Sequence, residues 1–361
     1  MLPAYDAASD YSHWDAGLWT RVLAASGVRS PFTDQPFTEA MLSGLAGGIG
    51  FMIFTFEYKE ITTASAVTRF HPGPYTENLL RRSGAAINIQ QTGSAKLAQS
   101  RLDAALETGV PAVVRVVRGK LPWAAEDPLA DADSVDVAVV ARDGGDYLVD
   151  DGGGQLRRST AQELAQARGS RKADKHWQAH VSPRGADPMD SEALTGEVVR
   201  AAMAETAGEL LSQQSPPGIP PGYAKNFGIL GMQTWAQRLA DSSTKHGWMR
   251  IFGDPDRSAA GMGMLHGLLA GKRYSGPGAL RPLYAQFLDE AAASTDAVSA
   301  TGRAGLAEAA AQYRALGEHW EALSALVGAA GEPDFAAMAG RVEAIAELEG
   351  HAAQTLQAAV A

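Results

Sequence analysis

The sequence contains few residues that could form a catalytic centre. The 361-residue chain has no cysteine, which excludes disulfides, a thiolate nucleophile, cysteine-ligated zinc and iron–sulfur clusters. Its eight histidines are scattered without the spacing of a metal site, so we expect neither a metal nor another cofactor. Any catalysis would therefore depend on positioning and on proton transfer by histidine or carboxylate side chains.

Three side chains are the candidates for proton transfer. His13 precedes an expected helix, where its alternative role is that of a surface or capping residue. Asp136 interrupts the apolar segment VDVAVVA, and a carboxylate there is costly unless it is paired, functional or solvated at the strand start. His71 lies in the loop FHPGPYTE, where it could carry a proton.

Other residues are candidates for substrate binding. Tyr58 follows a glycine-rich turn and either lines a pocket or is solvated. Asp150 ends a strand before three glycines, so it belongs to a site or forms the turn. Arg281 and Tyr284 share one face of a helix that follows the loop SGPG. They could hold a carboxylate, phosphate or oxyanion, or Arg281 could instead pair with an acidic neighbour.

Hydrophobic periodicity places these residues on expected elements. In the N-terminal half we expect helices at 12–26 (capped by Ser12 and Asp15), from Thr38, at 94–109 and at 159–170, and strands at 51–56, 111–118, 135–142 and 146–150. In the C-terminal half we expect helices at 190–213, 226–241, 257–271, 281–294, 301–328 and 333–360. The turn Asp143-Gly144-Gly145 predicts a hairpin.

This pattern predicts an α+β protein with two domains. An α/β domain with an antiparallel sheet would occupy residues 1–180, and an all-α domain ending in an alanine-rich helical hairpin would occupy residues 181–361. The apolar faces of that hairpin favour packing on a second subunit, so we expect a homodimer.

Composition limits the partners. The net charge of −10, without basic runs, argues against binding to nucleic acid or an anionic membrane. The N-terminus has neither a basic segment nor an apolar core typical of a signal peptide, and the most apolar stretch, 41–56, is too short to span a bilayer. We therefore expect a cytoplasmic protein.

Two stretches carry a resemblance to a known family. They are TEAMLSGLAGGIGF at 38–51 and SGPGALRPLYAQFLDEA at 275–291. With them, the chain resembles the butirosin-biosynthesis acyltransferase family, which joins a papain-like N-terminal domain to a helical domain of unknown function. The resemblance implies a papain-like α/β fold in the first domain.

The resemblance also implies a reaction centre, and this sequence departs from it. Family members have a His-Cys pair on the first helix, a base histidine opening a strand and an orienting aspartate. They are thought to move an acyl group from a carrier protein onto an amine. Here Trp14 follows His13 at the cysteine position, the base position falls at Val135 or Asp136, and Asp150 matches the aspartate. An acyl-cysteine intermediate is therefore excluded, and Trp14 is expected to form a wall of the substrate site.

Two functions from different classes remain. The first is a natural-product biosynthesis enzyme that acts on an acyl or carbonyl small molecule, or on a carrier-bound intermediate, by non-covalent acid–base catalysis. Its reaction would be cyclisation or condensation, hydrolysis or direct acyl transfer. The alternative is a non-catalytic scaffold that binds an acyl carrier protein or a partner enzyme. A hydrolase that uses Ser12 as the nucleophile is a weaker third interpretation, since no base is placed for it.

Overall fold

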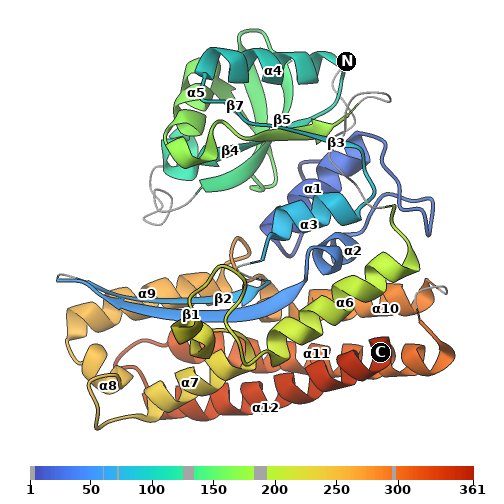
Figure 1. Ribbon diagram of the computed structural model, residues 1–361. Coiled ribbons are helices and arrows are strands. Elements are labelled where there is room, and N and C mark those ends of the chain that lie inside the picture. The colour runs from blue at the N-terminus through green and yellow to red at the C-terminus, as the bar shows by residue number, and fades with distance from the viewer. Residues whose placement is uncertain (1–4, 60, 71–72, 125–133, 183–192, 295–297) are drawn as a thin grey trace. The chain divides into compact units, whose positions relative to one another are not determined.

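Figure 1 shows the computed structural model, which describes residues 5–59, 61–70, 73–124, 134–182, 193–294 and 298–361. The chain divides into two compact units. Unit 1 comprises residues 1–39 and 80–193, and unit 2 comprises residues 40–79 and 194–361.

Unit 1 is built on an antiparallel sheet. Among the described residues its strands have the spatial order β3-β8-β4-β5-β6-β7. Their bounds are β3 Ile87–Gln90, β4 Ala112–Val117, β5 Ser134–Asp143, β6 Asp146–Asp150, β7 Leu156–Thr160 and β8 Gln178–Val181. The predicted hairpin joins β5 to β6, and Gly144 adopts the positive φ of +65° that this tight turn requires.

Three helices accompany this sheet, namely α1 (Trp14–Ala25), α4 (Ala95–Glu107) and α5 (Ala161–Gly169). Helices α4 and α5 bury Leu102 and Leu164 against the valines of β4 and β5, which forms the core of the unit. Local capping fixes where both helices start: Ser94 accepts a hydrogen bond from the N–H of Leu97, and Thr160 forms a capping box with Glu163.

Unit 2 is largely helical, as the periodicity predicts. Its C-terminal helices are α6 Gly196–Leu211, α7 Gly228–Ala240, α8 Trp248–Ile251, α9 Pro255–Ala270, α10 Arg281–Ala293, α11 Ala300–Val327 and α12 Phe335–Val360. Helices α11 and α12 are the alanine-rich pair, and they pack along each other (Figure 1). The mixed α/β region and the helical region together confirm the α+β class.

Unit 2 also contains a β-hairpin from the N-terminal half of the chain. Strands β1 (Ile49–Glu57) and β2 (Thr62–Arg69) follow helix α2 (Glu39–Leu45), and helix α3 (Tyr75–Arg82) comes next.

Buried side chains of the helices hold the segment before and within this hairpin. The Asn226 side chain donates to the carbonyl of Ile53 at 2.6 Å, and the Thr206 hydroxyl donates to the carbonyl of Gly47 at 2.6 Å. The two compact units therefore differ from the predicted domains 1–180 and 181–361, because residues 40–79 pack with the C-terminal helices. Within the described part of the chain, no helix is both long and apolar enough to cross a membrane.

Candidate functional site

The start of α1 differs from the expected capping box. His13, and not Ser12, is the N-cap residue, and its side chain makes no capping hydrogen bond. The backbone N–H groups of Ser12 and His13 instead donate to the carboxylate of Glu39, at 2.9 and 2.6 Å. The prediction that Ser12 and Asp15 cap this helix is therefore wrong, because a carboxylate 26 residues beyond His13 satisfies the backbone donors. The His13 side chain is 1% exposed.

Trp14 connects α1 to the strand that would carry a base. Its indole N–H donates to the carbonyl of Asp136 in β5 at 2.9 Å. The indole also lies on Gly152, where a Cβ atom would come within 2.7 Å of the ring, and Gly152 has a φ of +76°. The indole thus fills the space between the position assigned to the nucleophile and the strand assigned to the base.

Asp136 has a cationic partner on the neighbouring strand. The β4–β5 register places Arg115 opposite Asp136, and the guanidinium binds the carboxylate through both oxygens at 2.8 and 3.3 Å. The guanidinium also lies 4.6 Å from the centre of the Trp177 ring. This pairing explains how an apolar strand tolerates a carboxylate. A catalytic role for Asp136 stays a prediction.

Asp150 is fully buried and combines two roles. One carboxylate oxygen binds Arg21 at 2.6 Å and accepts the hydroxyl of Tyr5 at 2.6 Å. The other oxygen accepts the N–H of Gly152 at 2.8 Å, which is the turn contact expected from the sequence. Burial, followed by the nearby Asp150 charge, raises the pKa of Tyr5 well above its usual value. These contacts order the turn beneath Trp14.

Two candidate residues of unit 2, Tyr58 and His71, are not part of a substrate site in the structure as described. Tyr58 is 56% exposed at the end of β1, and its ring centre lies 6.4 Å from that of Phe56. His71 falls outside the described residues.

Arg281 is 0% exposed and connects the stretches 275–291 and 38–51, which carry the resemblance to the family. Its guanidinium binds Glu349 at 2.6 Å and donates to the carbonyls of Gly50 and Thr68 at 3.0 and 2.6 Å. Tyr284, also buried, packs on Gly48, where a Cβ atom would come within 2.3 Å of the ring. These contacts are structural, and the substrate-anchoring roles of Arg281 and Tyr284 stay predictions.

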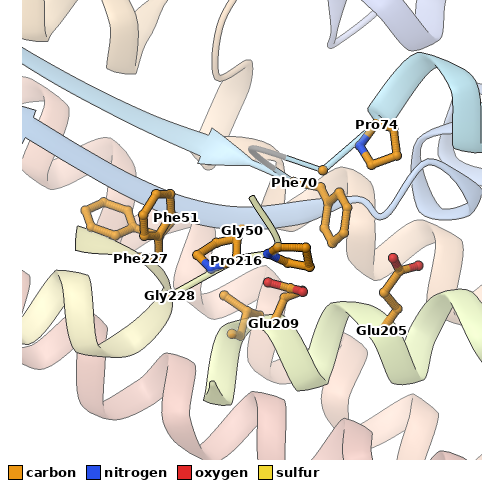
Figure 2. A pocket seen from close by; sticks show the side chains of 12 residues that line it. Gly50, Phe51, Phe70, Pro74, Glu205, Glu209, Pro216, Phe227 and Gly228 are labelled. Carbon is orange, nitrogen blue, oxygen red and sulfur yellow. The ribbon is translucent and has the colours of Figure 1, made fainter. Parts of the chain in front are cut away.

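A pocket in unit 2 contains two carboxylates that the sequence analysis did not single out. Glu205 and Glu209 lie one turn apart on α6 and line a cavity of about 170 Å³. Figure 2 shows both carboxylates rising from α6 toward β1 and the ring of Phe70. The remaining walls are mainly aromatic rings, prolines and glycine backbone, from Gly50, Phe51, Phe70, Gly73, Pro74, Leu210, Pro216, Pro217, Phe227 and Gly228.

The start and the buried face of α6 determine where the side chains of Glu205 and Glu209 lie. Helix α6 begins at the cap Thr195, and its buried face includes Ala202, Thr206 and Leu210. Residues 205 and 209 flank that face, so their side chains emerge at its edge. Gly228 lets the next helix start against the end of α6, because a Cβ there would lie 2.7 Å from the carbonyl of Leu210.

The pocket changes the proton affinity of one acid. Burial, and secondarily the charge of Glu205, raises the pKa of Glu209 above its usual value. Among the described residues, those that line the cavity include no lysine or arginine. Two carboxylates in such a largely apolar lining favour a positively charged or proton-donating ligand. The sequence signal was the spacing of Glu205 and Glu209 before the proline-rich loop, which alone does not distinguish a pocket from a solvated face.

Comparison with known families accounts for most of the chain. Residues 13–152 match the family described as butirosin biosynthesis protein H, N-terminal. Residues 162–356 match the family described as domain of unknown function (DUF4872). The chain belongs to the DUF4872 family, and its N-terminal part is a domain of the butirosin biosynthesis protein H family. No curated protein matches its sequence.

The match to the butirosin biosynthesis protein H family relates the chain to natural-product biosynthesis. It also makes the absence of cysteine informative, because the resemblance places a cysteine nucleophile in this domain. The first matched segment begins at His13 and ends at Gly152, which are the neighbours of Trp14 in sequence and in space, respectively. A tryptophan stands where the resemblance places the nucleophile. Among the described residues, no group of three or more histidine or acidic side chains is arranged to bind a metal ion.

We expect that Trp14→Cys will not restore an acyl-enzyme. The new thiol would lie at a helix N-terminus, which lowers its pKa, but the carboxylate at the base position is paired with Arg115. Incubation with a butyryl thioester of N-acetylcysteamine, followed by intact-mass spectrometry, should show no butyryl adduct. Ser100→Cys, on the exposed side of α4, is the control for non-specific acylation. Stoichiometric acylation of Trp14→Cys alone would show that this site keeps a working base.

Proposed function

We propose that this chain is a natural-product biosynthesis enzyme that transfers an acyl group from a thioester directly to an amine, without an acyl-enzyme. Family membership supports the reaction class, and the absence of cysteine supports the direct route. The observation that carries the proposal is the pair Glu205 and Glu209 in an apolar cavity, where Glu209 has a raised pKa. Such a pair suits the binding and deprotonation of an amine.

In the proposed step, the bound ammonium first releases one proton to solvent, and the neutral amine nitrogen then attacks the thioester carbonyl. The new C–N bond forms as the C–S bond breaks, and the proton lost by the nitrogen goes to the Glu209 carboxylate and then to the departing thiolate. The Glu205 carboxylate stabilises the positive charge that develops on the nitrogen. No oxidant or further reactant is required.

The residues predicted from the sequence offer a competing assignment of the same chemistry. His13, Asp136 and His71 are the alternative proton carriers, and retained activity in all three alanine variants would leave Glu209 as the better candidate. His71 directly follows the pocket residue Phe70 in the sequence, so it is the first of the three to replace.

A non-catalytic scaffold is the second candidate function. The observation that favours it is the indole of Trp14, which occupies the space between the nucleophile and base positions and hydrogen-bonds to Asp136. A scaffold of this kind would bind an acyl carrier protein or a partner enzyme. It predicts no amide formation and no preference of the glutamate pocket for an amine.

Binding of a simple amine tests the proposed site. Benzylamine and benzyl alcohol have similar shapes, but only benzylamine is a cation at neutral pH. We expect isothermal titration calorimetry to show benzylamine binding at least about tenfold more tightly, the effect of one charge-assisted hydrogen bond. Because the pKa of Glu209 is raised, this preference should weaken on acidification at a higher pH than an ordinary glutamate would give.

Two variants identify the group responsible. Glu209→Gln keeps the shape of the side chain but removes its charge, so it should reduce the preference for benzylamine. Glu197→Gln removes a mostly exposed charge on the same helix, where Glu197 pairs with Arg200, and should leave binding unchanged. Equal affinity for benzylamine and benzyl alcohol in the wild-type protein would exclude the pocket as an amine site.

A further inference from the structure

Large apolar side chains are exposed together at the end of the β1–β2 hairpin. Phe56, Tyr58 and Ile61 are 48, 56 and 44% exposed there. Tyr223, which is 47% exposed, lies in the short helical segment 221–226 that contacts β1. Contiguous exposed apolar surface on a protein marks an interaction site. We call this set of residues, together with Phe54, the aromatic face of β1.

The rings of the aromatic face form a continuous row. Phe54, Phe56 and Tyr58 occupy alternate positions of the chain, so their side chains lie on one side of the hairpin. The rings of Phe54 and Phe56 are nearly parallel, with centres 5.7 Å apart. Tyr58 extends the row at 6.4 Å from Phe56, and Tyr223 lies 5.8 Å from Phe54. The row therefore offers ring surface to a ligand that runs along the strand.

The outer edge of β1 adds hydrogen-bonding groups beside this row. The N–H of Tyr58 donates to the carbonyl of Ile61 across the turn, at 2.8 Å. Backbone groups alternate along a strand, so those of Thr55 and Glu57 point to the opposite side, away from β2. Among the described residues, these outward groups have no hydrogen-bond partner. Such an edge is a template for an added strand.

Helix α9 holds the end of the hairpin in place. The guanidinium of Arg257 donates to the hydroxyl of Thr62 at 3.2 Å and to the carbonyl of Lys59 at 2.5 Å. Gly261 lies against β2, since a Cβ atom there would come within 3.1 Å of the Thr62 carbonyl. Helix α9 thus packs on β2, which leaves the edge of β1 for an added strand.

Area and charge decide what could bind there. The three exposed rings offer roughly 300 Å², whereas a standard protein interface needs about 800 Å² from each partner. The surface therefore suits a short segment better than a second copy of the chain. A second copy paired symmetrically about Phe56 would also bring two Glu57 carboxylates together on one side of the sheet. A cation opposite Glu57 would instead form a favourable cross-strand pair.

We propose that the edge of β1 binds an extended, cationic peptide segment as an additional antiparallel strand. The segment carries aromatic or other large apolar residues at alternate positions, which pack on the aromatic face of β1. It carries a lysine or arginine opposite Glu57. The net charge of −10 attracts such a segment. This surface does not depend on the proposed amine site.

A fluorescein-labelled peptide of sequence Thr-Phe-Lys-Phe-Thr-Phe tests the added strand by fluorescence anisotropy. In the proposed register its lysine lies opposite Glu57, and its phenylalanines lie opposite Tyr58, Phe56 and Phe54. We expect saturable binding. N-methylation of the lysine and of the second threonine removes the two N–H groups that face β1, so it should weaken binding at least about fivefold. N-methylation of the phenylalanine between them, whose N–H points away, is the matched control and should leave the affinity unchanged.

Three protein variants test the side-chain contacts. Glu57→Lys should weaken binding of the lysine peptide about two- to tenfold, and a peptide with glutamate in place of lysine should recover the loss. Phe56→Ser should weaken binding at least about threefold, because an aromatic contact is lost. Leu97→Ser removes a similarly exposed apolar side chain, 43% exposed on α4, and should have no effect.

Four results would overturn this proposal. Equal effects of N-methylation at the two kinds of position would exclude strand addition. Failure of the glutamate peptide to recover binding to Glu57→Lys would remove Glu57 from the contact. Absence of binding by a protein that thermal unfolding shows to be folded would exclude this class of segment. Sedimentation equilibrium that shows a dimer in the wild-type protein, but not in Phe56→Ser, would assign the surface to a second copy.

Discussion

Replacement of Arg281 by alanine will lower the free energy of unfolding by about 3–5 kcal/mol. The arginine and its partner Glu349 are both fully buried, so removal of one leaves an unpaired buried charge. The guanidinium also binds the carbonyls of Gly50 and Thr68, and its centre lies 5.1 Å from that of the Trp320 ring. Loss of Arg281 therefore removes the connection between the β1–β2 hairpin and helices α10 and α12.

Urea unfolding followed by tryptophan fluorescence measures this effect, since Trp320 donates a hydrogen bond to Glu349 at 3.0 Å. Arg314→Ala is the matched control, because Arg314 forms an exposed ion pair with Asp289 that should contribute less than about 1 kcal/mol. The double variant Arg281→Met with Glu349→Met should recover part of the loss, since it leaves no charge unpaired. A cost for Arg281→Ala as small as that for Arg314→Ala would refute the structural role of this pair.

Replacement of Glu209 by glutamine will reduce acyl transfer to an amine by about 100-fold or more. General-base catalysis typically contributes a factor of 10²–10⁴, and glutamine cannot accept the amine proton. The fall should appear in kcat as well as in kcat/KM, because proton transfer belongs to the chemical step. The rate is measured as butyryl benzylamide formed from the butyryl thioester of N-acetylcysteamine and benzylamine.

Glu197→Gln supplies the control for this activity, since it removes a charge from the same helix away from the pocket. Its rate should match that of the wild-type protein. If Glu209→Gln and Glu197→Gln have equal rates, the proton acceptor lies elsewhere, and His13, Asp136 and His71 become the candidates to test.

Elements with strong local periodicity were predictable from the sequence. The C-terminal helices, the helix capped by Ser94 and the β5–β6 hairpin all carry their signals within a few residues. Strand β2 was missed because its sequence, TTASAVTR, has little apolar alternation, and its pairing with β1 provides the missing information. Helix α3 was missed for a different reason, because its first turn, which starts at Tyr75, lies within the segment FHPGPYTE that was interpreted as a loop.

The site was harder to predict because long-range contacts define it. Glu209 belongs to α6, but the cavity around it requires Phe70 and Phe227, which are far apart in the sequence. Asp136 stood out correctly as an unusual carboxylate, whereas its partner Arg115 became apparent only from the pairing of β4 with β5. Local patterns identify such residues, and the tertiary structure determines which of them are already paired.

Intact-mass spectrometry during turnover distinguishes direct acyl transfer from a route through an acyl-enzyme. The wild-type protein would be incubated with the butyryl thioester of N-acetylcysteamine and benzylamine, and protein mass and amide product followed together. Direct transfer predicts butyryl benzylamide that depends on Glu209, with no butyryl adduct on the protein at any time. A butyryl adduct that forms and decays at the rate of amide formation, for example on Ser12, would contradict the direct route, and the absence of any amide would contradict the proposed activity.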